Sequence, residues 1–182
     1  MVALGTRAPD FALPDTEGRT VRLADFDGKP LLVIFLCNHC PYVKHIANDL
    51  AQVTAKYMQK GIAAVAISSN DVENYPEDSP AHMRTEKRNR GYLFPYLYDE
   101  SQDVARAYDA TCTPDFFLYD RDRNLVYRGQ FDDSRPGNGK PITGLDLTLA
   151  VEGLVAGKPA VANQKPSMGC NIKWKPLLRP VA

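Results

Sequence analysis

The chain has 182 residues, and its 22 Lys and Arg residues balance its 22 Asp and Glu residues, so the formal net charge is zero. This length favours a single domain, and the hydrophobic and charged fractions of 44% and 24% are ordinary for a soluble globular protein. The charge balance argues against a nucleic-acid partner, and four cysteines are too few for a disulfide scaffold.

The sequence shows no pattern of a membrane anchor or a secretory signal. No segment approaches the ~18 consecutive apolar residues of a transmembrane helix, and the N-terminus lacks a positive start followed by an apolar run. We therefore expect no membrane association and a cytoplasmic location, where thiols are kept reduced. Cysteine pairs in that compartment are more often catalytic or metal-binding than structural.

The first 67 residues predict a turn-rich extension followed by a strand–helix–strand unit. Within the extension, residues 20–23 alternate as a short strand does. Residues 31–36 are a continuous apolar run, typical of a strand buried on both faces of a parallel sheet. Residues 41–59 carry apolar side chains at helical spacing, and residues 62–67 form a second apolar run. Together they predict a right-handed parallel crossover.

The rest of the chain predicts shorter elements around this unit. The last 24 residues contain four prolines and little periodicity, so we expect an extended tail there. We assign residues 1–160 to one domain and residues 161–182 to a tail docked on it. The other expected elements are an acidic loop at 70–80, helices at 80–90, 101–109 and 144–156, a strand at 95–98, and a hairpin of strands 115–119 and 125–129.

The segment Cys37-Asn38-His39-Cys40 lies between the first buried strand and the helix that follows it. Two intervening residues in a tight helical entry bring the sulfurs within disulfide reach. Unpaired N–H groups and the positive end of the helix dipole favour thiolate over thiol, and a protonated His39 would add to this effect. We interpret the segment as a redox pair. There are two alternative interpretations. The pair could form part of a zinc site, which usually needs four ligands, or it could be two inert thiols.

Further motifs follow in a characteristic order. Ala8-Pro-Asp-Phe11 precedes the first buried strand and the cysteine pair, and Thr113-Pro114 precedes the strand 115–119. In this order the chain resembles, from about residue 5 to about residue 130, the thioredoxin-like redoxin class. That class includes the alkyl hydroperoxide reductase/thiol-specific antioxidant family and membrane-tethered thiol-disulfide oxidoreductases. The resemblance implies an α/β thioredoxin-like fold, with a central mixed sheet flanked by helices, an N-terminal extension and a C-terminal tail.

The resemblance also implies roles for individual residues. Cys37 would be the exposed nucleophile, and Cys40 would turn inward and resolve the mixed disulfide. Pro41, however, suits the first position of the helix, which would make Cys40 the N-cap; between the two we favour Cys37 as the attacking thiol. The bond between Thr113 and Pro114 should be cis, with the Thr113 backbone available to a substrate chain. The alternative is a proline that merely begins a strand.

The chain departs from its relatives at three points, the first of which is Leu36, where many relatives have tryptophan before the first cysteine. Leu31 stands where thioredoxins carry a buried aspartate that helps to move the proton of the second thiol. Asp71 and Glu73 are weak substitutes and more readily interpreted as solvated loop charges. The peroxiredoxin pattern of proline, three residues, threonine, two residues and cysteine is incomplete, because Pro30 is followed by Ile34 instead of threonine. We therefore do not expect efficient peroxidase chemistry at the pair.

Two more cysteines are candidates for additional redox thiols. Cys112 lies two residues before Pro114, so the fold should bring it near the pair, either as a third redox thiol or as a small buried hydrophobe. Cys170 lies on the tail beside Ile172 and Trp174, whose apolar side chains suggest that this piece docks on the domain. A disulfide partner for the site and a packed structural thiol are its two interpretations.

The sequence as a whole predicts a cytoplasmic thiol–disulfide oxidoreductase that acts in cellular redox homeostasis and needs no cofactor or resident metal. Its expected catalytic residues are Cys37, His39, Cys40, Thr113 and Pro114. Its expected partners are a protein or small-molecule disulfide or thiol substrate and a thiol electron donor. The alternatives are a thiol-dependent peroxidase of peroxiredoxin type and a metal-binding or copper-delivery module that uses the pair and a histidine.

Overall fold

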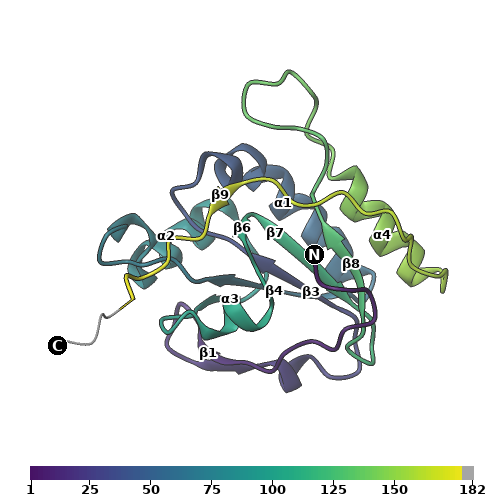
Figure 1. Cartoon of the computed structure of the whole chain (residues 1–182), viewed down its shortest axis with the longest axis horizontal. Coiled ribbons are helices and arrows are strands. Elements are labelled where there is room, and N and C mark those ends of the chain that lie inside the picture. Colours follow the sequence, from purple (N-terminus) through teal and green to yellow (C-terminus); the bar gives the residue numbers. More distant parts are fainter. Residues whose placement is uncertain (178–182) are drawn as a thin grey trace.

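The computed structural model describes residues 1–177. At its centre lies a five-stranded sheet. In spatial order the strands are β5 (Tyr96–Tyr98), β4 (Ala63–Ser68), β3 (Leu31–Phe35), β7 (Asp115–Tyr119) and β8 (Leu125–Gly129) (Figure 1). The sheet is mixed, because β3, β4 and β5 run parallel whereas β7 pairs antiparallel with both β3 and β8.

Helices cover both faces of this sheet. α1 (Pro41–Gln59), α2 (Pro80–Arg90) and α4 (Leu145–Val155) pack on one face. The short α3 (Asp103–Ala107) packs on the other face, together with the N-terminal extension. The extension forms a hairpin of β1 (Ala12–Pro14) and β2 (Thr20–Arg22), followed by a short 3-10 helix, η1 (Leu23–Phe26).

β3 is buried on both faces, as its apolar sequence predicted. Leu32 and Ile34 belong to the hydrophobic cluster under α1, whereas Leu31, Val33 and Phe35 belong to the cluster on the opposite face. Successive side chains of a strand point to opposite faces, so a strand covered on both sides has no solvated position. The buried side chains of α1 recur at helical spacing: Val43, Ile46, Ala47, Leu50, Ala51, Thr54 and Tyr57.

The helix predicted over residues 101–109 is shorter than expected. It spans only Asp103–Ala107, because Gln102 and Asp109 have φ values of 67° and 53°. These values lie in the left-handed region, which does not continue a right-handed helix. The other predicted helices and strands begin and end within one residue of their predicted bounds.

The tail forms a strand that the sequence did not predict. β9 (Cys170–Asn171) pairs antiparallel with β6 (Cys112–Thr113), with Cys170 opposite Thr113. Figure 1 shows this part of the chain, in yellow, running from α4 past α1 to β9 and on toward α2. A strand of two residues is too short to show periodicity, so only the structure reveals this pairing.

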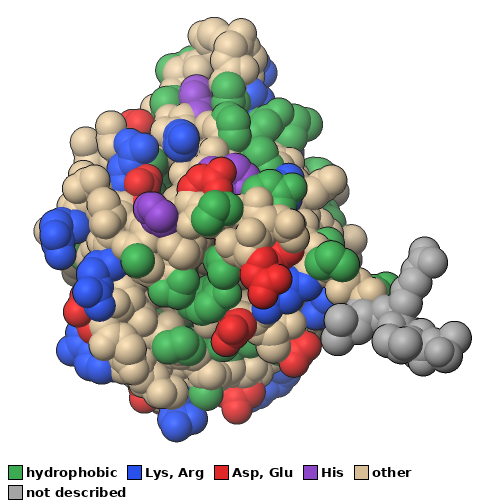
Figure 2. All heavy atoms as spheres, turned by 90° about the vertical axis from the view of Figure 1, so that its left-hand side faces the viewer, with side chains coloured by type: hydrophobic (Ala, Val, Ile, Leu, Met, Phe, Trp, Pro, Cys, Tyr) green, Lys and Arg blue, Asp and Glu red, His purple; other side chains and the backbone are tan. Residues whose placement is uncertain are grey.

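The surface shows no single-sign charge patch on the face drawn in Figure 2, where basic and acidic side chains are interspersed among hydrophobic ones and histidines. This mixture fits the zero net charge of the chain. Among residues 1–177, no helix combines the length and the apolar composition that crossing a membrane requires.

Candidate functional site

The cysteine pair lies where β3 leads into α1. Cys40 has an extended backbone, with φ −63° and ψ 125°, and is the N-cap of the helix. Pro41 takes the first helical position, as its missing N–H group predicted. The positive end of the dipole of a 19-residue helix therefore lies at Cys40.

Thr113 and Pro114 lie against this pair. The peptide bond between them is cis, as the resemblance implied. The Thr113 hydroxyl oxygen lies 3.4 Å from Cys37 Sγ, and its carbonyl oxygen lies 3.3 Å from Cys40 Sγ. The structure thus brings together four of the residues that the sequence singled out, from segments more than 70 positions apart.

Both members of the pair are closed off from solvent. Cys37 is 1% exposed and Cys40 is 0% exposed. The expectation of an exposed Cys37 is therefore wrong for this structure, because Thr113 packs on one thiol and the tail residue Cys170 packs on the other. A partner thiol or disulfide does not reach either sulfur of the pair while the tail lies in this position.

The two thiols differ in acidity. The pKa of Cys40 is lowered, chiefly because Cys37 donates a hydrogen bond to the Cys40 thiolate, and Cys170 lowers it further against the opposing effect of burial. The pKa of Cys37 is raised by the same hydrogen bond, and burial and the nearby carboxylate of Asp78 raise it further. The place of Cys40 at the helix N-terminus acts in the same direction, because the positive end of the helix dipole favours a thiolate there.

The tail brings a third thiol to the site. Cys170 Sγ lies 2.7 Å from Cys40 Sγ, and Cys170 is partly exposed. Cys112 is 6% exposed, and its Sγ lies 3.7 Å from the carbonyl oxygen of Pro114. Burial raises the pKa of Cys112 to about 12, as expected for a packed thiol. Of the two additional cysteines, Cys170 is the one that contacts the pair.

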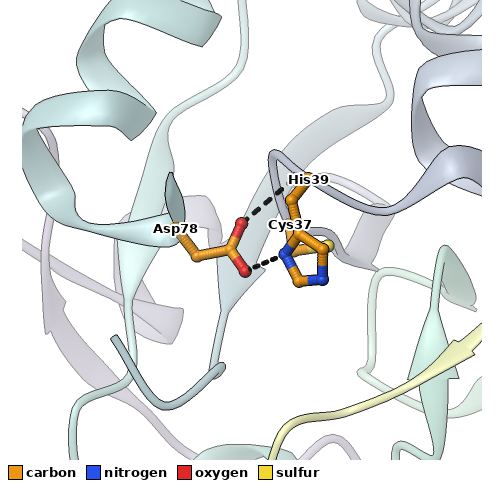
Figure 3. Close-up of side chains that lie close together, drawn as sticks. All are labelled: Cys37, His39 and Asp78. Atoms are coloured by element: carbon orange, nitrogen blue, oxygen red, sulfur yellow. Dashed lines mark hydrogen bonds and ion pairs between the residues drawn. The ribbon is translucent and has the colours of Figure 1, made fainter. Parts of the chain in front are cut away.

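Asp78 supports the loop that carries the pair, and the sequence did not single it out. It ends the short 3-10 helix η2 (Pro76–Asp78) and is 0% exposed. Its Oδ1 accepts hydrogen bonds from the backbone N–H groups of Asn38 and His39, at 2.7 and 3.1 Å. Its Oδ2 pairs with Nδ1 of His39 (Figure 3). The same oxygen accepts a hydrogen bond from the side chain of Asn70 at 2.9 Å. One carboxylate thus fixes both residues between the cysteines.

The neighbouring acids do not take this place. Glu73 is exposed, as expected of a loop charge. Asp71 is only 2% exposed, so its interpretation as a solvated charge is wrong. It accepts hydrogen bonds from the N–H of Glu73 and the side chain of Asn74, and its own N–H donates to the carbonyl of Lys173 in the tail at 2.8 Å. Asp71 therefore shapes its own loop and holds the tail.

Three groups of metal-ligand type come together beside the loop. The donor atoms of Cys37, His39 and Asp78 all lie within 4.8 Å of one another (Figure 3). This set differs from the pair plus a histidine expected for a metal-binding module, because Asp78 stands in place of Cys40. Three donors are fewer than the four of a structural zinc site, and both oxygens of Asp78 already accept hydrogen bonds within the protein. The arrangement works as a hydrogen-bonded support for the loop.

Asp115, which follows Pro114, makes stability depend on pH. Burial raises its pKa from 3.8 to about 6, although Ser167 and Arg128 act in the opposite direction. Because the folded pKa lies above the unfolded one, the stability gained from protonation is complete below about pH 4 and is lost as the pH rises through about 6. Asparagine has no proton to lose, so the free energy of unfolding of Asp115→Asn should not fall over this pH range. Relative to the wild type, we expect it to rise by up to about 3 kcal/mol as the pH increases from about 4 to above 6. Denaturant unfolding at pH 4 and pH 7 measures this, and an equal difference at both pH values would contradict it.

A family model and a curated protein match most of this chain. The model of the AhpC/TSA family matches residues 4–128. The thiol-disulfide oxidoreductase ResA of Geobacillus thermodenitrificans (strain NG80-2) is 31% identical over 127 residues, which cover 66% of this chain and 65% of that protein. The chain therefore matches slightly less than two thirds of the length of this curated relative.

Solved structures match over more of the chain. A hypothetical protein from Sinorhizobium meliloti 1021 is 53% identical, with a TM-score of 0.94 and a coverage of 96% of both chains. The thioredoxin domain of a thiol-disulfide oxidoreductase from Bacteroides vulgatus is 22% identical, with a TM-score of 0.59 and a coverage of 70% of this chain and 89% of that one. The similarity to the Bacteroides vulgatus domain concerns the fold alone, and it agrees with the α/β architecture that the motifs implied.

Proposed function

This chain belongs to the AhpC/TSA family and has a thioredoxin-like fold, and on this basis we propose that it is a thiol–disulfide oxidoreductase whose redox pair is Cys37 and Cys40. One observation carries the proposal. Both sulfurs lie within 3.4 Å of Thr113, beside the cis bond to Pro114 and at the N-terminus of a long helix. Such a position favours a thiolate and brings two thiols within reach of one another.

Cys40 starts the exchange in this proposal. Direct attack requires that the tail leave Cys40, which it covers in this structure. The Cys40 thiolate then attacks one sulfur of the substrate disulfide, forms a mixed disulfide and releases the other sulfur, which takes up a proton. Cys37 then gives up its proton and attacks Cys40 Sγ, which closes the Cys37–Cys40 disulfide and releases the second substrate thiol. Two electrons pass from the pair to the substrate, and a thiol electron donor returns them by the reverse steps. The sequence favoured Cys37 as the attacker, but the lowered pKa of Cys40 favours Cys40.

The other site residues position the pair. His39 stacks on Tyr75, with ring centroids 5.3 Å apart, and pairs with Asp78, so the loop between the cysteines has a fixed shape. The sequence expectation of a Thr113 backbone free for a substrate chain does not hold in this structure, because β9 already pairs with β6 there. We propose a protein or small-molecule disulfide as the substrate and the reducing cytoplasm, with a role in redox homeostasis, as the setting.

The proposal is tested with the full chain in a disulfide-reduction assay that uses insulin and dithiothreitol. We expect the protein to accelerate reduction well above the rate of dithiothreitol alone, and no acceleration would contradict the proposal.

A stopped-flow measurement with hydrogen peroxide tests the peroxidase alternative. Ile34 replaces the threonine of the peroxidatic pattern and is 0% exposed in β3, so we expect oxidation no faster than that of free cysteine.

A further inference from the structure

The tail is held on both sides of the site. Before β9, the side chain of Gln164 bonds both the carbonyl of Val126 and the N–H of Arg128, and the Ser167 hydroxyl donates to the carbonyl of Gly129 at 2.6 Å. After β9, the backbone N–H of Lys173 donates to the Asn70 side chain, and its carbonyl accepts from the N–H of Asp71. The N–H of Lys175 donates to the side chain of Gln102. The Arg106 guanidinium lies over the Trp174 ring, 4.9 Å from the ring centroid. These contacts fix the tail over the cysteine pair.

Gly169 lets the tail pass directly over the cis bond. A Cβ atom at this position would lie 2.0 Å from the carbonyl oxygen of Thr113 and 3.2 Å from the nitrogen of Pro114. Both are backbone atoms that cannot move aside, so a larger residue does not fit while β9 pairs with β6. The close approach places the next residue, Cys170, opposite Thr113.

The resulting arrangement gives Cys40 two thiol neighbours. Cys37 is joined to it through the loop, and Cys170 approaches from the tail to 2.7 Å between sulfurs. A disulfide bond measures about 2.05 Å, so a small movement of the two side chains closes this gap. Cys37 and Cys40 are buried, whereas Cys170 is partly exposed. Of these three cysteines, Cys170 is the one that is not buried.

We propose that Cys170 is a third redox thiol of this site, through which the buried pair exchanges disulfides with external partners by forming a Cys40–Cys170 disulfide. This inference rests on the proposed function and specifies how that function reaches its substrate. The tail occupies the strand position that Thr113 offers, and it presents Cys170 to Cys40 as an internal substrate.

The exchange then proceeds in three balanced steps. The Cys170 thiol gives up its proton and attacks an external disulfide, which leaves one partner sulfur on Cys170 and releases the other as a thiol. The Cys40 thiolate attacks Cys170 Sγ, so the Cys40–Cys170 bond forms and the second partner sulfur leaves and takes up a proton. Cys37 attacks Cys40 Sγ, and Cys170 leaves and takes up the proton of Cys37. The external disulfide gains two electrons, and Cys37 and Cys40 together lose them.

Trypsin digestion separates the relevant thiols and so provides the test. Because trypsin does not cleave before proline, Cys170 falls in residues 129–173, the pair in residues 23–44 and Cys112 in residues 107–121. The Cys37→Ser variant of the full chain is equilibrated with glutathione redox buffers, alkylated, digested and analysed by mass spectrometry. We expect peptide 23–44 linked to peptide 129–173, with an effective thiol concentration in the millimolar range or above.

Matched variants decide between the outcomes. Cys112→Ser added to Cys37→Ser should leave the linked peptide unchanged, and Cys170→Ser should abolish it. Gly169→Ala should lower its yield by roughly fivefold or more, since inserting a methyl group into a packed contact costs about 1–3 kcal/mol. Gly153→Ala is the control, because a Cβ there meets no atom within 4 Å.

Insulin reduction gives a second readout. As a single substitution in the otherwise unchanged chain, Cys170→Ser should slow the reduction of insulin at least severalfold, whereas Cys112→Ser should not.

The failure of this inference differs from the failure of the proposed function. A wild type that forms the Cys37–Cys40 disulfide, together with a Cys37→Ser variant that forms no peptide linked through Cys170, would overturn the third thiol alone. A linked peptide that survives Gly169→Ala at full yield would overturn the delivery of Cys170 by the docked tail. A wild type that forms neither disulfide would overturn both proposals.

Discussion

Cys40→Ser is expected to lower the rate of insulin reduction by roughly a thousandfold or more, to the level of dithiothreitol alone. Serine forms no disulfide, and in the proposed exchange Cys40 is the sulfur that both Cys37 and Cys170 require as their partner. The loss should therefore exceed that of Cys37→Ser, in which Cys170 still resolves a mixed disulfide on Cys40. The initial rate of reduction under one fixed dithiothreitol concentration measures all three proteins.

Cys112→Ser is the matched control for this experiment. Cys112 is buried and packs near the pair, but its sulfur lies against the carbonyl of Pro114. We expect the Cys112→Ser variant to reduce insulin at a rate within about twofold of the wild type, because the substitution removes no thiol that contacts the pair. An active Cys40→Ser variant together with an inactive Cys37→Ser variant would return the attacking role to Cys37. Full activity of both variants would contradict the redox pair itself.

Asp78→Ala is expected to destabilise the protein by roughly 3–5 kcal/mol, since it removes one partner of a fully buried, hydrogen-bonded charge. Four groups lose their partner at once: the backbone N–H groups of Asn38 and His39, the His39 ring and the Asn70 amide. These groups are mostly closed off from water, so solvent does not replace the lost carboxylate. Urea unfolding at neutral pH, followed by circular dichroism, measures the change.

Glu77→Ala provides the control for Asp78→Ala. Glu77 is the neighbouring acid on the same 3-10 helix, but its side chain is exposed, so we expect a change within about 0.5 kcal/mol. Equal unfolding midpoints for the two variants would show that the hydrogen bonds of Asp78 contribute little to stability. A destabilised Asp78→Ala variant should also lose exchange activity at temperatures where it is still folded, because the loop between the cysteines has lost its support.

Local sequence patterns predicted the part of the site that lies on regular elements. A buried strand, a Cys-x-x-Cys segment and an amphipathic helix follow each other directly, so their junction needs no long-range information. Pro41 indicated the N-cap because the chemistry of proline restricts where it fits in a helix. The cis bond between Thr113 and Pro114 was implied by the resemblance to the redoxin class and not by a local pattern, and the structure shows it.

Long-range contacts explain what the sequence did not reveal. Asp78 lies in a polar, acidic loop, and nothing near it in the sequence distinguishes it from Glu77, yet the fold buries one and exposes the other. The pairing of β9 with β6 joins residues about 60 positions apart in two-residue strands, which leave no periodic signal. Gly169 is interpretable only once the carbonyl of Thr113 is known to lie beneath it.

The most direct test of the central claim is a redox titration of the Cys170→Ser variant, in which only the Cys37–Cys40 couple is left at the site. Samples equilibrated in dithiothreitol and glutathione buffers of graded potential, which together span the range of known Cys-x-x-Cys pairs, are alkylated and digested, and the mass of peptide 23–44 is measured in each. We predict a single two-electron transition in which Cys37 and Cys40 lose their reactivity toward the alkylating agent together, with a disulfide inside that peptide. Two cysteines that stay alkylatable across the whole range, or that lose reactivity independently, would contradict the assignment of Cys37 and Cys40 as the redox pair.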